Sequence, residues 1–136
     1  MTKGSVLLIL VLILALHLLL LINTKFTLWP EMVVYPYLLN NGFNSYTDII
    51  NPYPPLFLGL LALFAKIFGY HPLPYQILTW SIILFIDLAI FFMVKNIAGK
   101  KAALFSCLFF AVLSIPFGIN GLWFDLVQIP LILASI

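Results

Sequence analysis

Residues 77–119 decide the fold class, and they read ILTWSIILFIDLAIFFMV, then KNIAGKK, then AALFSCLFFAVLSIPFGI. The outer parts, residues 77–94 and 102–119, are each 18 residues long and almost wholly apolar. This length is close to the roughly 20 residues with which a helix crosses a bilayer. The segment between them, residues 95–101, is short and carries three lysines and a glycine. The pattern predicts two membrane-spanning helices joined by a tight basic turn.

The composition of the whole chain also indicates a membrane protein. Of its 136 residues, 65% are hydrophobic and 7% are charged, against roughly 45–50% and about 25% in soluble domains. Six lysines and four acids are too few to cover a soluble surface. The net charge of +2 comes from scattered lysines, which argues against nucleic-acid binding. A single cysteine, Cys107, permits neither a disulfide nor a cysteine metal site within the chain, so we interpret it as a packing residue.

A further span precedes this region. Residues 5–22 carry no charge and are not followed by a cleavage site of small residues, so we expect an uncleaved anchor helix. Residues 23–55 are rich in proline, asparagine and tyrosine, and we expect residues 23–76 to form a long outer loop that lies on the membrane. Within this loop, Pro30 and Gly42 frame a short interfacial helix that Pro36 distorts.

The lysines decide whether the apolar residues 56–68 cross the membrane. Runs of this length are more often re-entrant, interfacial or buried helices than spans. If residues 56–68 do not cross, four lysines are cytoplasmic and two are outside, whereas a crossing leaves only two inside. The four are Lys3, Lys95, Lys100 and Lys101, and the outer two are Lys25 and Lys66. Because cytoplasmic loops are enriched in basic residues, we expect no crossing.

If residues 56–68 do not cross, the N-terminus lies in the cytoplasm, and the chain is expected to be a multi-pass protein of the cell membrane. The same topology places Glu31, Asp48 and Asp125 on the outer face.

Residues 122–136 begin another span that stops without a polar flank, and a helix ending inside the bilayer leaves its carbonyls unsatisfied. We therefore expect residues 1–136 to be the N-terminal part of one transmembrane domain. The expected fold is all-α, with the long interfacial loop between the first two spans.

Two acids are candidates for catalysis because each lies at the mouth of a helix beside a tryptophan. Glu31 ends the segment Thr27-Leu28-Trp29-Pro30-Glu31, and Asp125 ends Asn120-Gly121-Leu122-Trp123-Phe124-Asp125. Each also has a structural explanation, Glu31 through the dipole of a helix start and Asp125 as the N-cap of a helix from Leu126. The functional interpretation is that both acids meet in one cleft at the membrane surface. There they divide into a base and an electrostatic or metal-binding group.

Asp87 lies near the middle of residues 77–94, where a charged aspartate costs about 2.5–3.5 kcal/mol on insertion. It must therefore face protein. A proton or ion pathway is the functional alternative. We favour a structural hydrogen bond to another helix, for example to His17, Ser106 or Ser114, because no second acid is available for a relay. His17 is interpreted in the same way.

The loop closes with Tyr46-Thr47-Asp48-Ile49-Ile50-Asn51-Pro52-Tyr53-Pro54-Pro55-Leu56, a stretch whose prolines restrict the backbone. One interpretation is a stiff turn that lowers the chain into the bilayer. The other is a wall of a polar-substrate site, in which Asp48, Tyr46 and Tyr53 bind the substrate. Aromatic faces of this kind suit sugar rings.

A series of short motifs follows the anchor helix in a defined order. They are Trp29-Pro30-Glu31, Tyr35, Leu38 to Gly42, Tyr46-x-Asp48, Pro54-Pro55-Leu56, Leu60-x-x-Leu63-x-x-Lys66-Ile67-Phe68-Gly69, Lys100-Lys101-Ala102-Ala103-Leu104 and Phe124-Asp125. Their order resembles that of polytopic glycosyltransferases of the GT-C class, in particular the protein mannosyltransferase and aminoarabinose transferase branch. The resemblance covers nearly the whole chain, and it is carried by the order of the motifs.

The resemblance implies transfer of a sugar from a polyprenyl-phosphate donor to an acceptor on the non-cytoplasmic face. Glu31 and Asp125 match the acids of the first two outer loops of that family, although Met32 follows Glu31 where the family commonly has an Asp-Glu pair. The resemblance makes Glu31 the general base or a ligand of a divalent ion, with Asp125 assisting. Lys66 and Lys25 are the outer basic candidates for the donor phosphate. Whether a metal takes part stays open.

Family members run to several hundred residues, so the resemblance also implies a missing C-terminal part that supplies much of the site. The expected partners are the lipid bilayer, the lipid-linked sugar donor and that remaining part. Two other classes stay open. A transporter fragment is supported only by Asp87, and transporters place their polar groups in broken helices at the midplane. A small structural membrane subunit is the third alternative.

Overall fold

The computed structural model describes residues 2–50 and 52–134. Within this part the chain forms five helices and two short strands, and the expectation of a mainly helical fold is confirmed. The helices are α1 (Lys3–Ile22), α2 (Glu31–Asn40), α3 (Pro55–Phe68), α4 (Pro72–Ser114) and α5 (Phe124–Ala134), and the strands are β1 (Thr27–Leu28) and β2 (Gly121–Leu122). By length and composition, α1 and α4 are able to cross a membrane.

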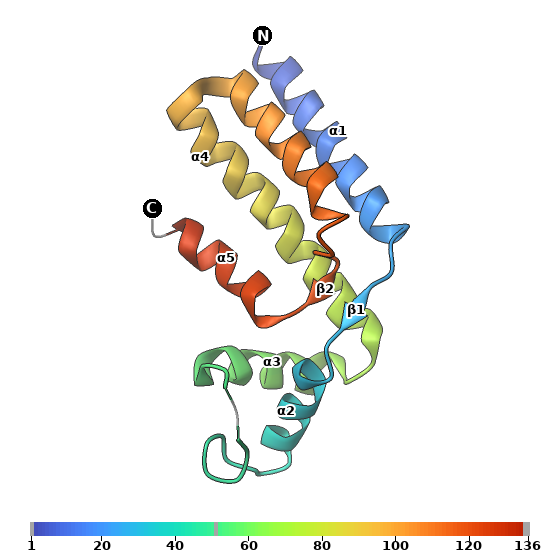
Figure 1. The fold of residues 1–136 in the computed structure, drawn as a ribbon, viewed down its shortest axis with the longest axis vertical. Coiled ribbons are helices and arrows are strands. Elements are labelled where there is room, and N and C mark those ends of the chain that lie inside the picture. The colour runs from blue at the N-terminus through green and yellow to red at the C-terminus, as the bar shows by residue number, and fades with distance from the viewer. Residues whose placement is uncertain (1, 51, 135–136) are drawn as a thin grey trace.

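Helix α4 reverses its direction at Gly99. This residue has φ 85° and ψ 175°, a conformation that is essentially restricted to glycine. The 43 residues of α4 therefore form two arms, the first arm (residues 72–98) and the second arm (residues 100–114). Figure 1 shows both arms beside α1, with the N-terminus and the turn at one end of this bundle.

The second arm ends before the predicted stretch 102–119 does. Helix α4 stops at Ser114, and the following residues form turns. Pro116 explains the stop, because it has no N–H with which to continue the helix. The Gly118 N–H then donates to the Ile115 carbonyl at 3.0 Å and closes a tight turn.

The bundle is built on one face of α1 and a row of small residues on the second arm. The buried side chains of α1 are Val6, Leu10, Ile13, His17 and Leu21. Their spacing of three and four residues places them on one side of the helix. The fully buried residues of the second arm include Ala103, Cys107 and Ala111. Small side chains let helices approach closely, so Cys107 is a packing residue, as predicted.

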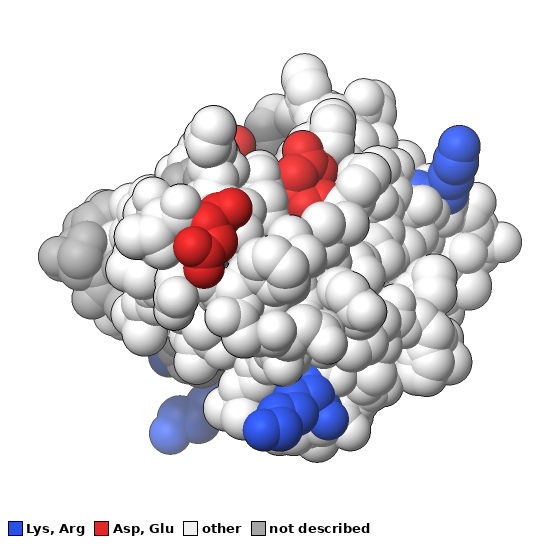
Figure 2. All heavy atoms as spheres, turned by 90° about the horizontal axis from the view of Figure 1, so that it is seen from below, with Lys and Arg blue, Asp and Glu red and all other residues white. Residues whose placement is uncertain are grey.

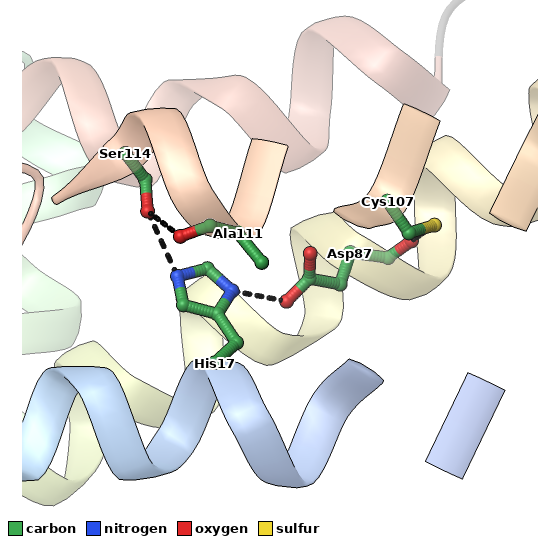
Figure 3. Close-up of polar contacts among 5 residues, drawn as sticks. All are labelled: His17, Asp87, Cys107, Ala111 and Ser114. Atoms are coloured by element: carbon green, nitrogen blue, oxygen red, sulfur yellow. Dashed lines mark hydrogen bonds and ion pairs between the residues drawn. The ribbon is translucent and has the colours of Figure 1, made fainter. Parts of the chain in front are cut away.

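A polar network lies inside this bundle and joins all three helical segments (Figure 3). His17 Nδ1 lies 2.7 Å from Asp87 Oδ2, and His17 Nε2 lies 2.9 Å from Ser114 Oγ. The Cys107 thiol donates to the Asp87 carbonyl at 3.3 Å. His17 and Asp87 are both fully buried. The prediction that Asp87 binds a side chain of another helix is confirmed.

Asp87, His17 and Ser114 are hydrogen-bonded in the order Asp–His–Ser, as in the catalytic triad of serine hydrolases. Here, however, the Ser114 hydroxyl also hydrogen-bonds the Ala111 carbonyl at 3.0 Å, and Ser114 is only 5% exposed. This hydroxyl is therefore engaged within the bundle. We assign the network to helix packing.

Helices α2 and α3 lie across the end of the bundle opposite the N-terminus (Figure 1). They share a core of buried apolar residues with the start of α4, formed by Met32, Phe57, Leu58, Leu61, Ala65, Tyr75 and Leu122. Asn40 Nδ2 donates to the Ala62 carbonyl at 2.9 Å and ties the end of α2 to α3. The helix predicted between Pro30 and Gly42 is confirmed as α2, with Pro36 inside it.

The network yields a prediction about stability. Replacing Asp87 by Leu leaves His17 without its carboxylate partner in the core, so we expect the free energy of unfolding to fall by about 1–3 kcal/mol. Asp87→Asn keeps an oxygen acceptor for His17 and should lose less. The measurement is thermal unfolding of the purified protein in detergent, followed by circular dichroism.

The control for this prediction is the double variant His17→Leu/Asp87→Leu. Removing both partners leaves no unpaired polar group, so the double variant should be more stable than Asp87→Leu alone. Equal stability of Asp87→Leu and the unchanged protein would contradict a structural role for the network.

Candidate functional site

The two short strands connect the bundle to the candidate site. Strand β1 follows α1, strand β2 precedes α5, and they pair in parallel with Thr27 opposite Gly121 and Leu28 opposite Leu122. A Cβ atom on Gly121 would lie 3.0 Å from the Thr27 carbonyl oxygen, so this close approach favours glycine. The pairing brings together two segments that lie more than ninety residues apart in sequence.

Asn120 holds the strand pair against the bundle. Its amide group is buried and donates to the Leu21 carbonyl and to Thr24 Oγ1, both at 2.9 Å. Its Oδ1 accepts a hydrogen bond from Trp80 Nε1 at 3.0 Å. One side chain therefore connects the end of α1, the first arm and the start of β2. Sequence analysis did not single out Asn120, because a lone asparagine in a turn shows no sign of such partners.

Beyond the paired strands, each segment continues through a tryptophan into a helix. Trp29 and Trp123 come next, and each of the following helices carries its acid in the first turn, Glu31 in α2 and Asp125 in α5. Both acids line one open cleft of about 250 Å³. The other residues that line this acid cleft are Trp29, Met32, Tyr53, Trp123 and Phe124.

The sequence itself contains a signal for this arrangement. Leu28-Trp29-Pro30-Glu31 and Leu122-Trp123-Phe124-Asp125 share the pattern Leu-Trp-x-acid. The two copies lie at equivalent places, each running from a strand into a helix.

The prediction that Asp125 is the N-cap of a helix from Leu126 is wrong, since α5 begins at Phe124.

Glu31 has an unusual environment within the acid cleft. Its side chain is half-buried, and its Oε2 atom is buried without a hydrogen-bond partner among the described residues. Buried carboxylate oxygens normally accept a hydrogen bond, because leaving one unpaired costs free energy. Asp125 is exposed. The cleft thus holds one acid that lacks a donor and one that is solvated.

Aromatic rings form one wall of the acid cleft. The Tyr53 ring lies 5.4 Å from the Phe124 ring, and Phe57 lies 5.3 Å from Phe124, measured between centroids. Burial, and then the nearby charge of Glu31, raise the pKa of the Tyr53 phenol, with smaller contributions from Tyr35 and Asp125. Nearby negative charge disfavours the phenolate, so Tyr53 keeps its proton and is able to donate a hydrogen bond.

The other predicted substrate-binding residues lie elsewhere. Asp48 is exposed, and its carboxylate accepts a hydrogen bond from the Asn44 N–H at 2.8 Å, which closes a turn of the loop. The Tyr46 hydroxyl donates a hydrogen bond to the Tyr53 carbonyl and so helps to hold the backbone of Tyr53 in place. Lys66 is exposed in the last turn of α3. The structure therefore brings Glu31, Asp125 and Tyr53 together in the cleft. Asp48, Tyr46 and Lys66 are not among the residues that line it.

The distribution of charged side chains at this end of the molecule agrees with an acidic cleft. Figure 2 shows the face seen from below, where acidic side chains lie within a largely uncharged surface and lysines project at its margins. Within the described ranges, no group of three His, Cys, Asp or Glu side chains comes together to hold a metal ion. Two carboxylates are the most that this part of the chain offers to a cation in the cleft.

The environment of Tyr53 provides a test of the cleft geometry. Replacing Glu31 by Gln removes a negative charge beside Tyr53, so we expect the pKa of the Tyr53 phenol to fall toward its ordinary value. The measurement is the phenolate absorbance during a pH titration, with the Tyr53→Phe form of each protein subtracted to isolate this residue. Asp48→Asn is the matched control, because its carboxylate is not among the charges acting on Tyr53, and it should leave this pKa unchanged. An unchanged Tyr53 pKa in Glu31→Gln would mean that the two side chains do not meet.

Comparison with known proteins returned no relatives. No family model matches the chain, no curated protein matches it, and no solved structure matches it. The residues and geometry of the acid cleft are therefore the guide to its function.

Proposed function

We propose that this chain is part of a multi-pass membrane glycosyltransferase of the GT-C class. In this proposal the protein transfers a sugar from a polyprenyl-phosphate-linked donor to an acceptor on the non-cytoplasmic face. The observation that carries the proposal is that Glu31 and Asp125 line one aromatic-walled cleft at one end of an apolar helix bundle. The motif order described above gives the proposal its reaction class.

The outer surface of the bundle supports a membrane location. Large apolar side chains are more than half exposed on both long helices, for example Leu7 at 63%, Phe85 at 56% and Phe105 at 68%. An apolar surface this extensive is unfavourable in water and favourable in lipid. We propose that α1 and the two arms of α4 span the bilayer and that α2 and α3 lie at its surface.

The distribution of lysines supports an orientation. Lys3, Lys95 and Lys100 line one groove at the end of the bundle that holds the N-terminus. The acid cleft lies at the opposite end. Because basic residues concentrate on the cytoplasmic side, the proposed orientation places the acid cleft at the outer surface. A lipid-linked sugar presents its phosphate and sugar at this level.

The chemistry of the cleft fits transfer to a hydroxyl group. Glu31 Oε2 has no hydrogen-bond partner in the described part of the chain, and it would accept the proton of the acceptor hydroxyl as the hydroxyl oxygen bonds to the sugar. The bond between the sugar and the donor phosphate breaks, and the phosphate leaves with its lipid chain. The rings of Trp29, Tyr53 and Trp123 would pack against the sugar. Asp125 would stabilise the positive charge that develops on the sugar.

A divalent ion fits this site only in part. Carboxylate oxygens are suitable ligands for such ions, and the cleft supplies two carboxylates. The described residues bring no third ligand of the His, Cys, Asp or Glu type to them. The basic group for the donor phosphate is likewise absent from the residues that line the cleft, and we propose that a further part of the protein supplies it.

The transporter alternative rested on Asp87. This residue is hydrogen-bonded to His17 inside the bundle, which favours a structural role over a relay.

The proposed topology predicts the labelling of two introduced cysteines in a Cys107→Ala background. Thr47 lies in the loop between α2 and α3, Asn96 lies beside the turn of α4, and both are exposed. In intact cells, a membrane-impermeant maleimide should label Thr47→Cys but label Asn96→Cys only after permeabilisation. Labelling of both positions from the same side would contradict the proposed orientation. The background protein without added cysteines controls for unspecific labelling.

The proposed reaction predicts a large effect at Glu31. A general base contributes about 10²- to 10⁴-fold to rate, so Glu31→Gln in the full protein should lower sugar transfer by that factor. Glu31→Asp keeps the carboxylate and should retain part of the activity, whereas Asp125→Asn should lose less than Glu31→Gln. The measurement is transfer from a lipid-linked sugar, normalised to the amount of protein in the membrane. Near-normal transfer by Glu31→Gln would remove Glu31 from the reaction.

A further inference from the structure

A second groove lies at the end of the bundle opposite the acid cleft. It has a volume of about 390 Å³ and lies between α1 and the first arm of α4. Three lysines line it, Lys3, Lys95 and Lys100, together with apolar side chains that include Leu7, Leu10 and Phe92. We propose that this lysine groove binds one phospholipid with an anionic headgroup. The inference rests on the membrane location in the proposed function and is independent of sugar transfer.

The lysines of this groove have no carboxylate partner in the described part of the chain. Asp87 is buried and paired with His17. Glu31 and Asp125 line the acid cleft at the opposite end, and Asp48 lies in the loop between α2 and α3. Three lysines that share one groove without an acid repel one another. A phosphate group between them would relieve this repulsion.

The contact between Lys95 and Phe92 shows how the charge and the apolar wall meet. Lys95 Nζ lies 5.5 Å from the centroid of the Phe92 ring. The Lys95 ammonium thus lies over the face of the Phe92 ring, in a cation–π contact that joins the charged part of the groove to its apolar wall. Lys95 is half-buried, whereas Lys3 and Lys100 are exposed. The charged ends are therefore within reach of a headgroup.

The apolar wall continues from the lysines toward the bilayer centre. Lys3 and Leu10 are separated by about 10 Å along α1, from the rise of the helix. Leu7 and Phe92 are 63% and 54% exposed, so they present an apolar surface along this depth. A free phosphate ion would use the lysines alone, whereas a phospholipid uses both parts of the groove. A headgroup that also carries a cation would meet repulsion from the lysines.

Lipid retention by the purified protein tests this inference. The protein is prepared in detergent, where orientation in a membrane has no influence, and is mixed with equal amounts of phosphatidylglycerol and phosphatidylcholine of identical chains. Native mass spectrometry then reports which lipid each protein molecule retains. We expect one phosphatidylglycerol to bind about tenfold more tightly than phosphatidylcholine, because basic residues near a membrane surface attract anionic lipid.

Two matched double variants each remove two lysines, one pair from the lysine groove and the other pair from the opposite part of the molecule. Lys95→Gln/Lys100→Gln should lose most of the preference for phosphatidylglycerol, whereas Lys25→Gln/Lys66→Gln removes the same charge and should keep it. Phe92→Ala removes part of the apolar wall and should weaken retention of both lipids. Circular dichroism confirms that each variant is folded. If Lys95→Gln/Lys100→Gln does not fold, the singly substituted Lys100→Gln, whose side chain is exposed, takes its place.

Three results would overturn the inference. The unchanged protein shows no preference for the anionic lipid, both lysine pairs reduce the preference equally, or inorganic phosphate displaces the lipid completely. Glu31→Gln separates this site from the proposed function. It should keep the lipid preference even though it loses sugar transfer, and a Glu31→Gln protein that retains both would refute the reaction and leave the lipid site in place.

Discussion

The hydrogen-bonded bridge from Asp87 through His17 to Ser114 holds the bundle in one arrangement. All three side chains are buried among apolar neighbours, where an unpaired polar group costs far more free energy than it does in water. Forming both hydrogen bonds of the bridge requires α1 to face both arms of α4 at matching heights, while the second carboxylate oxygen, Asp87 Oδ1, has no partner among the described residues. Apolar packing alone tolerates small rotations and shifts of such helices, but these hydrogen bonds do not. The bridge therefore sets the positions of the helix ends from which the rest of the chain continues.

The acid cleft is a consequence of those positions. With the end of α1 held beside the second arm, Asn120 reaches the Leu21 carbonyl, and strands β1 and β2 pair over two residues. The strand pair thus leads into the first turns of α2 and α5, whose acids line one cleft. A pairing of so few residues is not stable by itself, and it forms here because the bundle has already brought the segments together. The bundle, Asn120 and the strand pair together hold the segments that carry Glu31 and Asp125.

The two ends of the molecule have opposite chemical characters. Lys3, Lys95 and Lys100 gather in one groove, and Glu31 and Asp125 gather in a cleft at the far end. Each group of like charges lies beside aromatic rings, and each lacks an ionic partner of opposite sign among its lining residues. Such an arrangement suits a protein whose ends meet different solutes at two surfaces of a bilayer. The proposed lipid site and the proposed transfer site follow from this separation.

Local features of the sequence determined the helical character, the turn at Gly99 and helix α2, because these depend on apolar length, backbone freedom and proline position. They also determined that Asp87 needs a partner on another helix, since a charge inside an apolar run must be satisfied. They did not determine which residues share the cleft. Tyr53 lines it while Asp48 and Lys66 do not, and Asp125 lies inside a helix turn rather than at its cap. The apolar helices are hydrophobic around most of their surface, so apolar character by itself does not encode which face meets which neighbour, and the row of small residues on the second arm marks only one of these faces. The buried hydrogen bonds of His17 and Asn120, made across more than sixty residues of chain, belong to the tertiary structure, where they join the helices at fixed heights.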